Sequence, residues 1–481
     1  MTIHTKNLIL ALLCAMASPA ASLQVPADSR QASGVPGRAQ ATPQQEQATS
    51  QQASATLSVG VAKKAITPGP EVKNWVTGRP YEKIHEPVYV RALFLGDSST
   101  EAVIISWDLV DAGESATHEV RKRIKAEMGI AEDHVLVNAT HNHSAPWSPV
   151  YSSGYRGKER DTWWALRYMP PQNDDPHFKK WMALLLDQTL AAVREARQSA
   201  KPASIWIGRA DISAYFQNRR PRPAKRGIAA ANTPKGFNFR HEEWNPDVLP
   251  GGASFGPMDR TMTLLSFRDA AGKTMASVYH LSGHAVALYP YTDGITADWP
   301  GTVSAGISNA LGGETVFLQG TAGDINPGRR GFEAVQEMEK GITALAKAAH
   351  RYSAQLETGK IKAGRIIAAL PLTNYGQNKL GIASVSSEVQ VISIGPLAFV
   401  TLPGEPMTEL GMAIRKHSPF PQTLVLGYSN GNGVHYVGMP GEKMYGGYET
   451  GEQASIGTDE AGPILVKTAV KLLNQLAPEQ P

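Results

Sequence analysis

Two histidines, His141 and His143, stand in segment 138–146, which reads Asn-Ala-Thr-His-Asn-His-Ser-Ala-Pro. The segment follows the apolar run 135–137, which predicts a short strand. Side chains two positions apart in an extended backbone lie on the same face, so both imidazoles are expected to point together where the strand ends. Paired imidazoles are a donor set for zinc. A histidine pair alone is weak evidence, because such pairs also occur on surfaces without a metal.

Three further residues whose side chains could bind a metal stand near the ends of other apolar runs. His284 follows the run 278–281, Glu405 lies between a predicted strand and a predicted helix, and Tyr436 lies in a glycine-rich loop after another predicted strand. Ligands in open α/β sheets gather outside the carboxyl ends of strands, so these side chains are expected to meet the two histidines. Each also has an ordinary explanation: a buried core histidine, a carboxylate favoured at a helix N-terminus, and a packed tyrosine.

The elements that must position these residues can be read from apolar runs and turn residues. Predicted strands span 88–95, 102–107, 134–138, 204–208, 262–267, 275–281, 315–319, 389–394, 397–402 and 424–428. Predicted helices span 114–128, 176–198, 301–311, 332–352, 407–417 and 463–476. Strands and helices alternate, which indicates the α/β class with mostly buried sheets. No internal repeat is visible in the sequence.

The first residues, 1–22, predict a signal peptide. Lys6 supplies the positive charge, 8–17 the apolar stretch, and 18–22 the small residues of a cleavage zone. A secreted or periplasmic protein is therefore expected. The only cysteine, Cys14, lies in this leader, so the mature chain can have neither a disulfide framework nor a cysteine nucleophile. A lipid anchor at Cys14 is the alternative to simple cleavage.

Residues 23–56 are rich in Gln, Ala and Ser and predict a disordered tether, while 57–481 are long enough to bury a large core. No later apolar run approaches the roughly twenty residues that a membrane span needs. The formal net charge of +4 is mild, and basic residues are not interleaved with aromatic ones in any run. These features argue against a nucleic-acid partner and against a transmembrane segment in the mature chain.

Two long segments, 147–175 and 221–257, break the alternation of strands and helices. Long irregular segments are either binding loops and lids or surface insertions without a role. Their aromatic residues could line an acyl groove or simply pack: Trp163, Trp164, Tyr168, Phe237, Phe239 and Trp244. Their basic residues would suit a polar or anionic substrate or form a solvated face: Arg156, Lys158, Arg160 and Arg167.

Several short motifs occur together, in one order and at characteristic spacing. They are 104–108, 140–146, 217–221, 283–285, 404–408, 435–437 and 448–449. In this set the chain resembles the N-terminal domain of the neutral/alkaline non-lysosomal ceramidases, a family of secreted or surface zinc amidases. The resemblance runs through nearly all of 57–481. It implies mixed β-sheets packed with helices in a single large catalytic domain.

The resemblance also implies roles for individual residues. Zinc would have four ligands: His141, His284, Glu405 and Tyr436. Of the two paired histidines, the family pattern favours the first as the ligand, and His143 would face the same cavity. Arg219 and Tyr448 match family positions that point at the substrate carbonyl.

The chain departs from the family in two places. The family has a Gly-Asp-Val-Ser-Pro segment whose serine is assigned as a nucleophile, but 323–327 read Gly-Asp-Ile-Asn-Pro. Because Asn326 cannot form an acyl-enzyme, a zinc-activated water is the expected nucleophile. Asn326 then either donates a hydrogen bond to the developing oxyanion or is an ordinary loop residue. The chain also ends soon after the last motif, so the family's C-terminal immunoglobulin-like domain is not expected.

The resulting expectation is a secreted zinc-dependent hydrolase of an amide bond. N-acyl-sphingosine (ceramide) or a related N-acyl lipid is the implied substrate, with peripheral membrane contact. His143 would shuttle the proton, while Tyr448, Arg219 and Asn326 would stabilise charge on the carbonyl oxygen. The alternatives are a zinc hydrolase of a non-lipid amide or ester, and a non-catalytic binding protein on the same scaffold.

Overall fold

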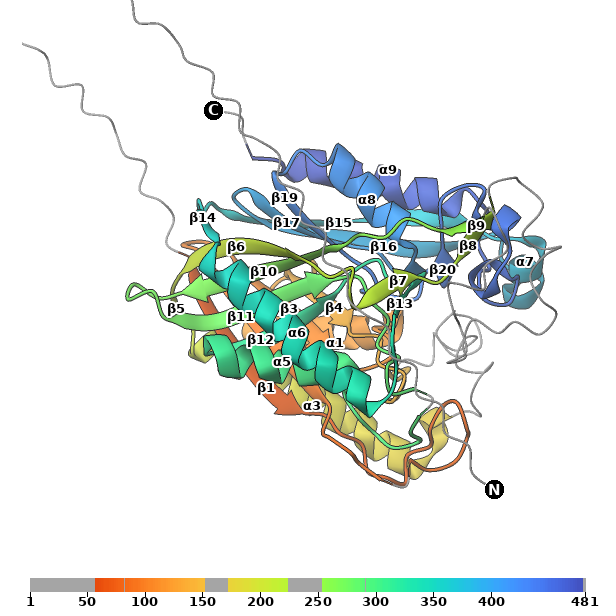
Figure 1. Cartoon of the computed structure of the whole chain (residues 1–481), viewed down its shortest axis with the longest axis horizontal. Helices are drawn as coiled ribbons and strands as arrows, with labels where there is room; N and C mark the ends of the chain where they lie inside the picture. Colours follow the sequence, from red (N-terminus) through yellow and green to blue (C-terminus); the bar gives the residue numbers. More distant parts are fainter. Residues whose placement is uncertain (1–56, 82, 152–171, 224–252, 290, 479–481) are drawn as a thin grey trace, which may run out of the picture. The chain divides into compact units, whose positions relative to one another are not determined.

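Three β-sheets built on one plan organise the chain (Figure 1). The computed structural model describes residues 57–478 apart from 82, 152–171, 224–252 and 290. The predicted leader and tether, and the aromatic and basic residues singled out in the two long segments, lie outside the described residues. Residues Ala53–Pro481 cluster as one unit. The predicted class, α/β with mixed sheets and packed helices, is confirmed.

The first sheet has the strand order β4-β3-β2-β1-β5. Its strands are β1 (Ser58–Ala65), β2 (Tyr89–Gly96), β3 (Glu101–Trp107), β4 (Val135–Ala139) and β5 (Lys201–Pro202). Strands β1, β2 and β3 pair antiparallel in sequence. The chain then passes through α1 (Glu114–Met128) and returns as β4, parallel to β3. Helix α3 (Pro176–Gln198) follows and packs against β1 and β2.

The second and third sheets have the orders β12-β11-β10-β6-β14 and β15-β16-β17-β19. The second contains β6 (Ser204–Asp211), β10 (Thr261–Arg268), β11 (Thr274–Leu281), β12 (Glu314–Gln319) and β14 (Ala354–Leu356), with helices α5 (Asp298–Leu311) and α6 (Phe332–Arg351). The third contains β15 (Ile361–Pro371), β16 (Ser384–Ile394), β17 (Leu397–Thr401) and β19 (Gln422–Leu426), with helices α7 (Asn374–Leu380), α8 (Thr408–His417) and α9 (Ala461–Leu476).

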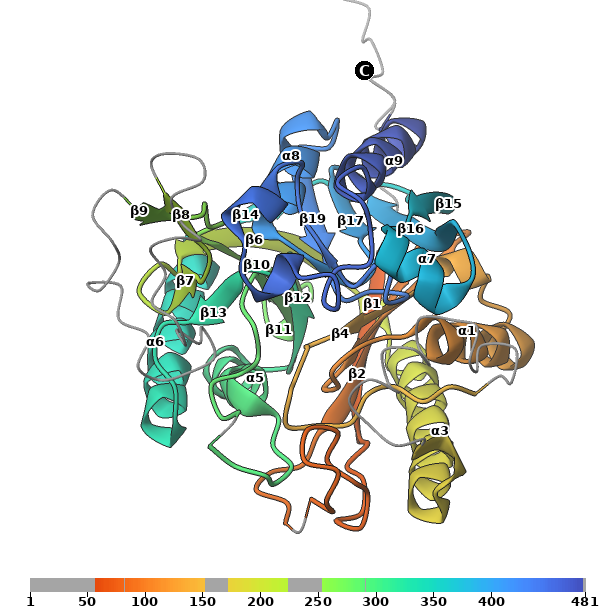
Figure 2. The same cartoon turned by 90° about the vertical axis from the view of Figure 1, so that its right-hand side faces the viewer.

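The three sheets repeat one topology, although the sequence shows no repeat. Each has three antiparallel strands, a crossover helix, a fourth strand parallel to the third, and a second covering helix. Figure 2 shows the three helix pairs, α1 with α3, α5 with α6 and α8 with α9, outside the sheets. The lack of a visible repeat in the sequence therefore did not reveal the repeat in topology. Different apolar residues satisfy the same burial pattern, so the repeat leaves no similarity of sequence.

The core lies on both faces of each sheet. In β3, Val103 and Ile105 pack with α1 and α3 in one cluster, while Ala102 and Ile104 join a second cluster shared by all three sheets. Alternate residues of a strand face opposite sides, so a sheet covered on both sides needs a continuous apolar run. Two further clusters lie under α5 with α6 and under α8 with α9. The ten predicted strands and six predicted helices are all present.

Local signals explain where helices begin. Asp175 caps α3 by accepting hydrogen bonds from the backbone N–H groups of His177 and Phe178, and Pro176 occupies the first helical position. In α6 the buried residues recur at helical spacing, as in Val335, Met338 and Ile342.

Three short strand pairs extend beyond the ends of the long strands, and the sequence did not predict them. They are β7 (Phe216–Asn218) with β13 (Ile325–Pro327), β8 (Pro221–Pro223) with β9 (Ala253–Phe255), and β18 (Glu405–Pro406) with β20 (Tyr436–Val437). Several of the candidate site residues lie on these pairs or beside them.

Candidate functional site

The candidate ligands meet at the carboxyl ends of strands from all three sheets. His141 and His143 follow β4, His284 follows β11, and Glu405 and Tyr436 lie on the short strands that follow β17 and β19. Backbone pairing joins these ends. Asn142 bridges Ala285 in parallel register, and Glu405 is the register partner of Tyr436. Residues that are distant in the sequence are therefore held side by side by main-chain hydrogen bonds.

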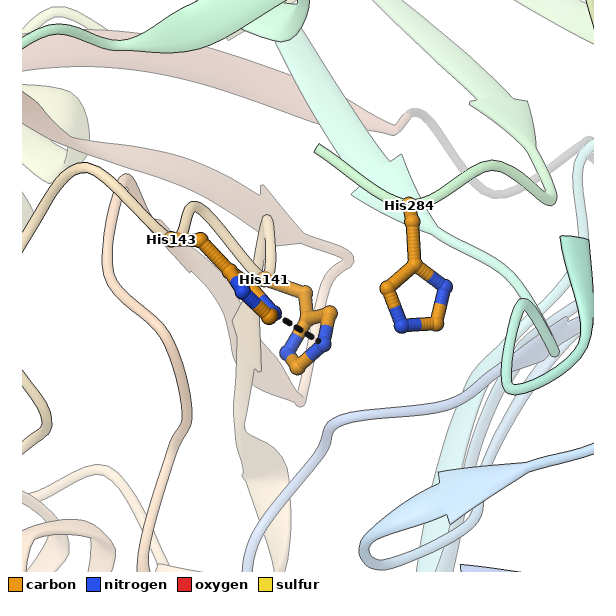
Figure 3. A group of neighbouring side chains, drawn as sticks. All are labelled: His141, His143 and His284. Carbon is orange, nitrogen blue, oxygen red and sulfur yellow. Dashed lines mark hydrogen bonds between the residues drawn. The ribbon is translucent and has the colours of Figure 1, made fainter. Parts of the chain in front are cut away.

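The three histidines form a tight group (Figure 3). Their ligand nitrogens all lie within 4.8 Å of one another. The ring centroids of His141 and His284 are 4.6 Å apart, and His143 Nε2 lies 3.0 Å from His141 Nε2. His141 and His284 are almost fully buried, while His143 is partly exposed to the cavity. The convergence expected from the sequence is thus present in the geometry.

Glu405 completes the group. Its Oε2 lies 3.1 Å from Nε2 of His141 and 3.1 Å from Nε2 of His284. Burial opposes the charged form of this carboxyl, but the neighbouring imidazoles, His141 first and then His284 and His435, outweigh it and hold the pKa of Glu405 well below its usual range. Burial, aided by Arg219, lowers the pKa of His284 to about 3. At neutral pH the pair is a carboxylate facing a neutral imidazole.

The Nδ1 atoms of His141 and His284 already donate hydrogen bonds to the backbone. Nδ1 of His141 donates to the carbonyl of Val110 at 2.8 Å, and Nδ1 of His284 donates to the carbonyl of Ala322 at 2.6 Å. Because a neutral imidazole carries one proton, each Nε2 then presents a lone pair. Two lone pairs facing a carboxylate oxygen repel it unless a cation lies among them. Backbone carbonyls that fix the tautomer in this way are typical partners of metal-ligating histidines.

Backbone strain concentrates in the same region. Of the five described non-glycine residues with positive φ, three lie at the site: His141, Tyr428 and His435, at 61°, 51° and 66°. The other two are Asp298 and Asn430. Such conformations are disfavoured for residues with a Cβ and persist where the surrounding structure enforces them, often at functional sites. Here the enforcing contacts are the hydrogen bonds between strand ends, such as that from Glu405 N–H to the His435 carbonyl, 2.9 Å long.

Arg219 lies beside the histidine group and organises one wall. Its guanidinium donates to the hydroxyl of Tyr436 at 3.1 Å and to Oδ1 of Asn326 at 3.0 Å. Its Nε lies 2.6 Å from Glu449 Oε1. Burial disfavours the charge on Arg219, but Glu449 outweighs it, so the pKa of Arg219 is raised. The guanidinium is thus a fixed cation. Tyr448 extends this wall, since its ring packs edge-on against Tyr436 with centroids 5.6 Å apart.

A cavity opens over the histidine group between two unlike walls. The polar wall contains the predicted residues Arg219, Asn326, Tyr436 and Tyr448 together with Glu449. The opposite wall is largely aromatic and apolar and consists of Trp75, Val76, Trp147, Val286 and Tyr289, with Arg330 also lining the cavity. His141, His143 and Glu405 line it too, so the cavity gives access to the candidate ligands.

Sequence reasoning missed several residues of this site. Tyr428 lies two residues after β19 with its hydroxyl 3.4 Å from Glu405 Oε2, and His435 has Nδ1 3.3 Å from Glu405 Oε1. The strand-end argument applied to Glu405 could have marked Tyr428 as a candidate, although not its contact with Glu405. No comparable signal marks Trp75 or Tyr289, because these residues reach the cavity from irregular segments.

The three-sheet α/β architecture is of the neutral ceramidase type. The neutral ceramidase from Pseudomonas aeruginosa matches this chain with a TM-score of 0.66 and 17% sequence identity, over 89% of this chain and 76% of that one. A solved structure of a ceramidase complexed with C2 gives a TM-score of 0.66 and 16% identity over the same shares of the two chains. No family model matches the sequence, and no curated protein matches it significantly. At this level of identity the likeness shows the fold.

Proposed function

We propose that this chain is a secreted, zinc-dependent hydrolase that cleaves an amide bond. One observation carries the proposal. Nε2 of His141 and Nε2 of His284 both face Oε2 of Glu405 at 3.1 Å while their Nδ1 atoms donate to backbone carbonyls. This buried set of acceptors suits a divalent cation, and nitrogen and carboxylate donors are those of catalytic zinc sites.

The proposed ligands are His141, His284, Glu405 and Tyr436. When bound, zinc supplies polarisation of the substrate carbonyl and activation of a water at neutral pH. A tyrosine ligand fits the position of Tyr436 on the cavity wall, although its hydroxyl bonds to Arg219. The group of three histidines alone is the other donor set that this geometry offers, with His143 in place of Tyr436.

The remaining catalytic work falls to residues of the cavity. Burial and the neighbouring His141 keep the pKa of His143 well below its usual value, so this imidazole is neutral at pH 7. Because His143 lines the cavity, we assign to it the transfer of the proton from the attacking water to the leaving amine. Asn326 Oδ1 accepts from Arg219, which leaves the amide N–H groups of Asn326 to donate to the carbonyl oxygen. Arg219 and Tyr448 add positive potential and a hydroxyl at the same wall.

The nucleophile in this proposal is water. A side-chain nucleophile at the family's serine position is excluded because Asn326 occupies it. The carboxamide can instead stabilise negative charge on the tetrahedral intermediate, which is a contribution that water attack also requires.

For the substrate we propose N-acyl-sphingosine (ceramide) or a related N-acyl lipid. The compared structures are ceramidases, and the aromatic wall formed by Trp75, Trp147 and Tyr289 is suited to an apolar chain. An amide with an anionic group is the second candidate, because Arg330 also lines the cavity. The expected location, secreted or periplasmic, rests on the leader at 1–22. No helix within the described parts of the chain has the length and apolar character to cross a bilayer.

The test is hydrolysis of a panel of N-acyl amides by the purified chain, before and after chelation and after zinc is returned. The panel should pair ceramides of different acyl length with N-acyl amino acids and with the esters of the same acids. The proposal expects turnover that is lost on chelation and regained with zinc. Turnover that persists at the same rate without metal would refute it.

A further inference from the structure

Tyr428 is fixed between the ends of two sheets. Its backbone N–H donates to the Gly404 carbonyl at 2.9 Å, and its carbonyl accepts from the Ala139 N–H at 3.0 Å. The residue has φ of 51° and is 3% exposed. These two hydrogen bonds, one to β4 and one to the residue before Glu405, hold the strained backbone of Tyr428 in place. The fixed backbone in turn directs the side chain towards the proposed metal ligands.

The side chain of Tyr428 lies against three of the proposed ligands. Its hydroxyl lies 3.4 Å from Glu405 Oε2, the same oxygen that both imidazoles face. Its ring packs on His141 with centroids 4.2 Å apart and planes inclined by 31°, and it meets the ring of His284 edge-on at 6.1 Å. Tyr428 is not among the described residues that line the cavity, so it approaches from the side away from substrate.

Tyr428 and Tyr436 therefore differ in position. Tyr436 lines the cavity and its hydroxyl bonds to Arg219, whereas the hydroxyl of Tyr428 faces Glu405 from behind. We propose that Tyr428 is a positioning residue of the metal site, which holds Glu405 Oε2 and the His141 ring in the arrangement that binds the cation. This inference rests on the proposed zinc site and assigns no contact with substrate.

The physical reason is the number of orientations that a carboxylate can adopt. A phenolic O–H that donates to Oε2 stabilises one rotamer of ionised Glu405, and the stacked ring limits rotation of His141 about its side-chain bonds. Ordering these ligands before the cation arrives removes part of the entropy cost of binding. Partners behind metal ligands commonly account for about 10- to 100-fold in metal affinity.

The experiment measures zinc affinity of the full mature chain by competition with a chromophoric chelator, in wild type, Tyr428→Phe and Tyr428→Leu. Tyr279→Phe is the matched control, because Tyr279 is a buried tyrosine whose hydroxyl donates to the Pro300 carbonyl at 2.8 Å, away from the site. Thermal unfolding of the metal-free proteins checks that each variant folds. The visible spectrum of the cobalt-loaded proteins reports ligand geometry without any need for turnover.

We expect Tyr428→Phe to weaken zinc binding by about tenfold and Tyr428→Leu by more, with an altered cobalt spectrum, while Tyr279→Phe binds as wild type. Unchanged affinity and spectrum in Tyr428→Phe would overturn the inference, and so would an equal loss in the control. The outcome is separable from the proposed activity. A wild type that binds zinc but hydrolyses no amide contradicts the proposed function and leaves the Tyr428 result standing.

Discussion

Glu405 and Tyr436 are register partners in the two-residue parallel pairing of β18 with β20. Main-chain hydrogen bonds between these segments, such as Glu405 N–H to the His435 carbonyl, hold the two backbones side by side at the site. The same pattern joins the histidines, because Asn142 bridges Ala285 and so carries His141 and His143 to His284. The proposed ligands are positioned by main-chain pairing, and their side chains need little reorganisation to meet.

Loss of His284 should remove metal and activity together. In His284→Ala, the cation loses an imidazole nitrogen and Glu405 Oε2 loses one of the two imidazoles that face it. We expect metal content to fall below one-tenth of wild type and turnover to become undetectable, as measured by elemental analysis and amide hydrolysis.

His350→Ala is the control for this prediction. His350 is a partly buried histidine that bonds to Ser266 and lies far from the strand-end cluster in its contacts. Metal binding should be unchanged in this variant. If His284→Ala retained metal while it lost activity, His284 would not be a ligand.

Arg219 should matter for turnover more than for metal binding. Arg219→Lys keeps the charge, but a single ammonium cannot reproduce the fork that joins Tyr436, Asn326 and Glu449. A hydrogen bond to a charged group contributes about 1.5–3 kcal/mol. The loss of one such bond in the transition state predicts a fall in kcat of about 10- to 100-fold.

Arg209→Lys is the control variant, because Arg209 is exposed and its guanidinium bonds to Gln422. Zinc affinity, measured by chelator competition, should be close to wild type in both lysine variants. A large loss of zinc affinity with unchanged kcat in Arg219→Lys would contradict this assignment.

Asn326 should act as a hydrogen-bond donor to the reacting carbonyl. Asn326→Ala and Asn326→Asp both remove that donor, since a carboxylate only accepts, and each should lower kcat by roughly 10²- to 10³-fold. Asn326→Ser should restore only part of the activity, because water remains the nucleophile. Wild-type turnover in Asn326→Ala, or a serine variant far faster than wild type, would argue that this residue does something else.

Much of this site could be predicted from the sequence because its residues follow strong local signals. His284 and Glu405 follow apolar runs within three residues, and each of those runs proved to be a strand. The strand-end rule placed each residue at the carboxyl end of a strand, but the three ends belong to three different sheets, and the backbone pairing that joins them is seen only in the structure. The resemblance to the ceramidase family implied the roles of the individual residues, and the structure adds the distances and hydrogen bonds between them.

The rest could not be predicted because it depends on contacts between distant segments. The pairing of Glu405 with Tyr436 involves only two residues per strand, too few for a periodic signal. The contact of Tyr428 with Glu405 requires an αL backbone at a non-glycine residue, which no turn signature marked. Trp75 reaches His143 from an irregular segment, with its indole N–H 3.2 Å from the His143 carbonyl.

Glu449 should contribute stability that depends on pH. Glu449 Oε1 lies 2.6 Å from Arg219 Nε, and Glu449 Oε2 lies 2.8 Å from Arg220 Nη1. Burial opposes the charge on Glu449, but these two cations outweigh it and hold the pKa of Glu449 below the usual 4.5. A carboxyl whose pKa is depressed in the folded state stabilises fully above its unfolded pKa, and that stability is lost as the pH falls through the folded pKa. Glu449→Gln should therefore lower the free energy of unfolding at pH 7 by about 3–5 kcal/mol.

The measurement is urea unfolding of wild type and Glu449→Gln from pH 7 down to pH 3. The difference between the two proteins should stay constant above pH 4.5 and shrink below it, because protonation of Glu449 then makes the wild type resemble the variant. A difference that grows as the pH falls would contradict the role of the ion pairs with Arg219 and Arg220.

The most direct test of the metal site is anomalous diffraction at the zinc edge from crystals of the mature chain. The account predicts a single strong peak within about 2 Å of His141 Nε2, His284 Nε2 and Glu405 Oε2, with the Tyr436 hydroxyl as the fourth ligand. A zinc-loaded, hydrolytically active protein with its anomalous peak elsewhere, and no peak at these three side chains, would contradict it.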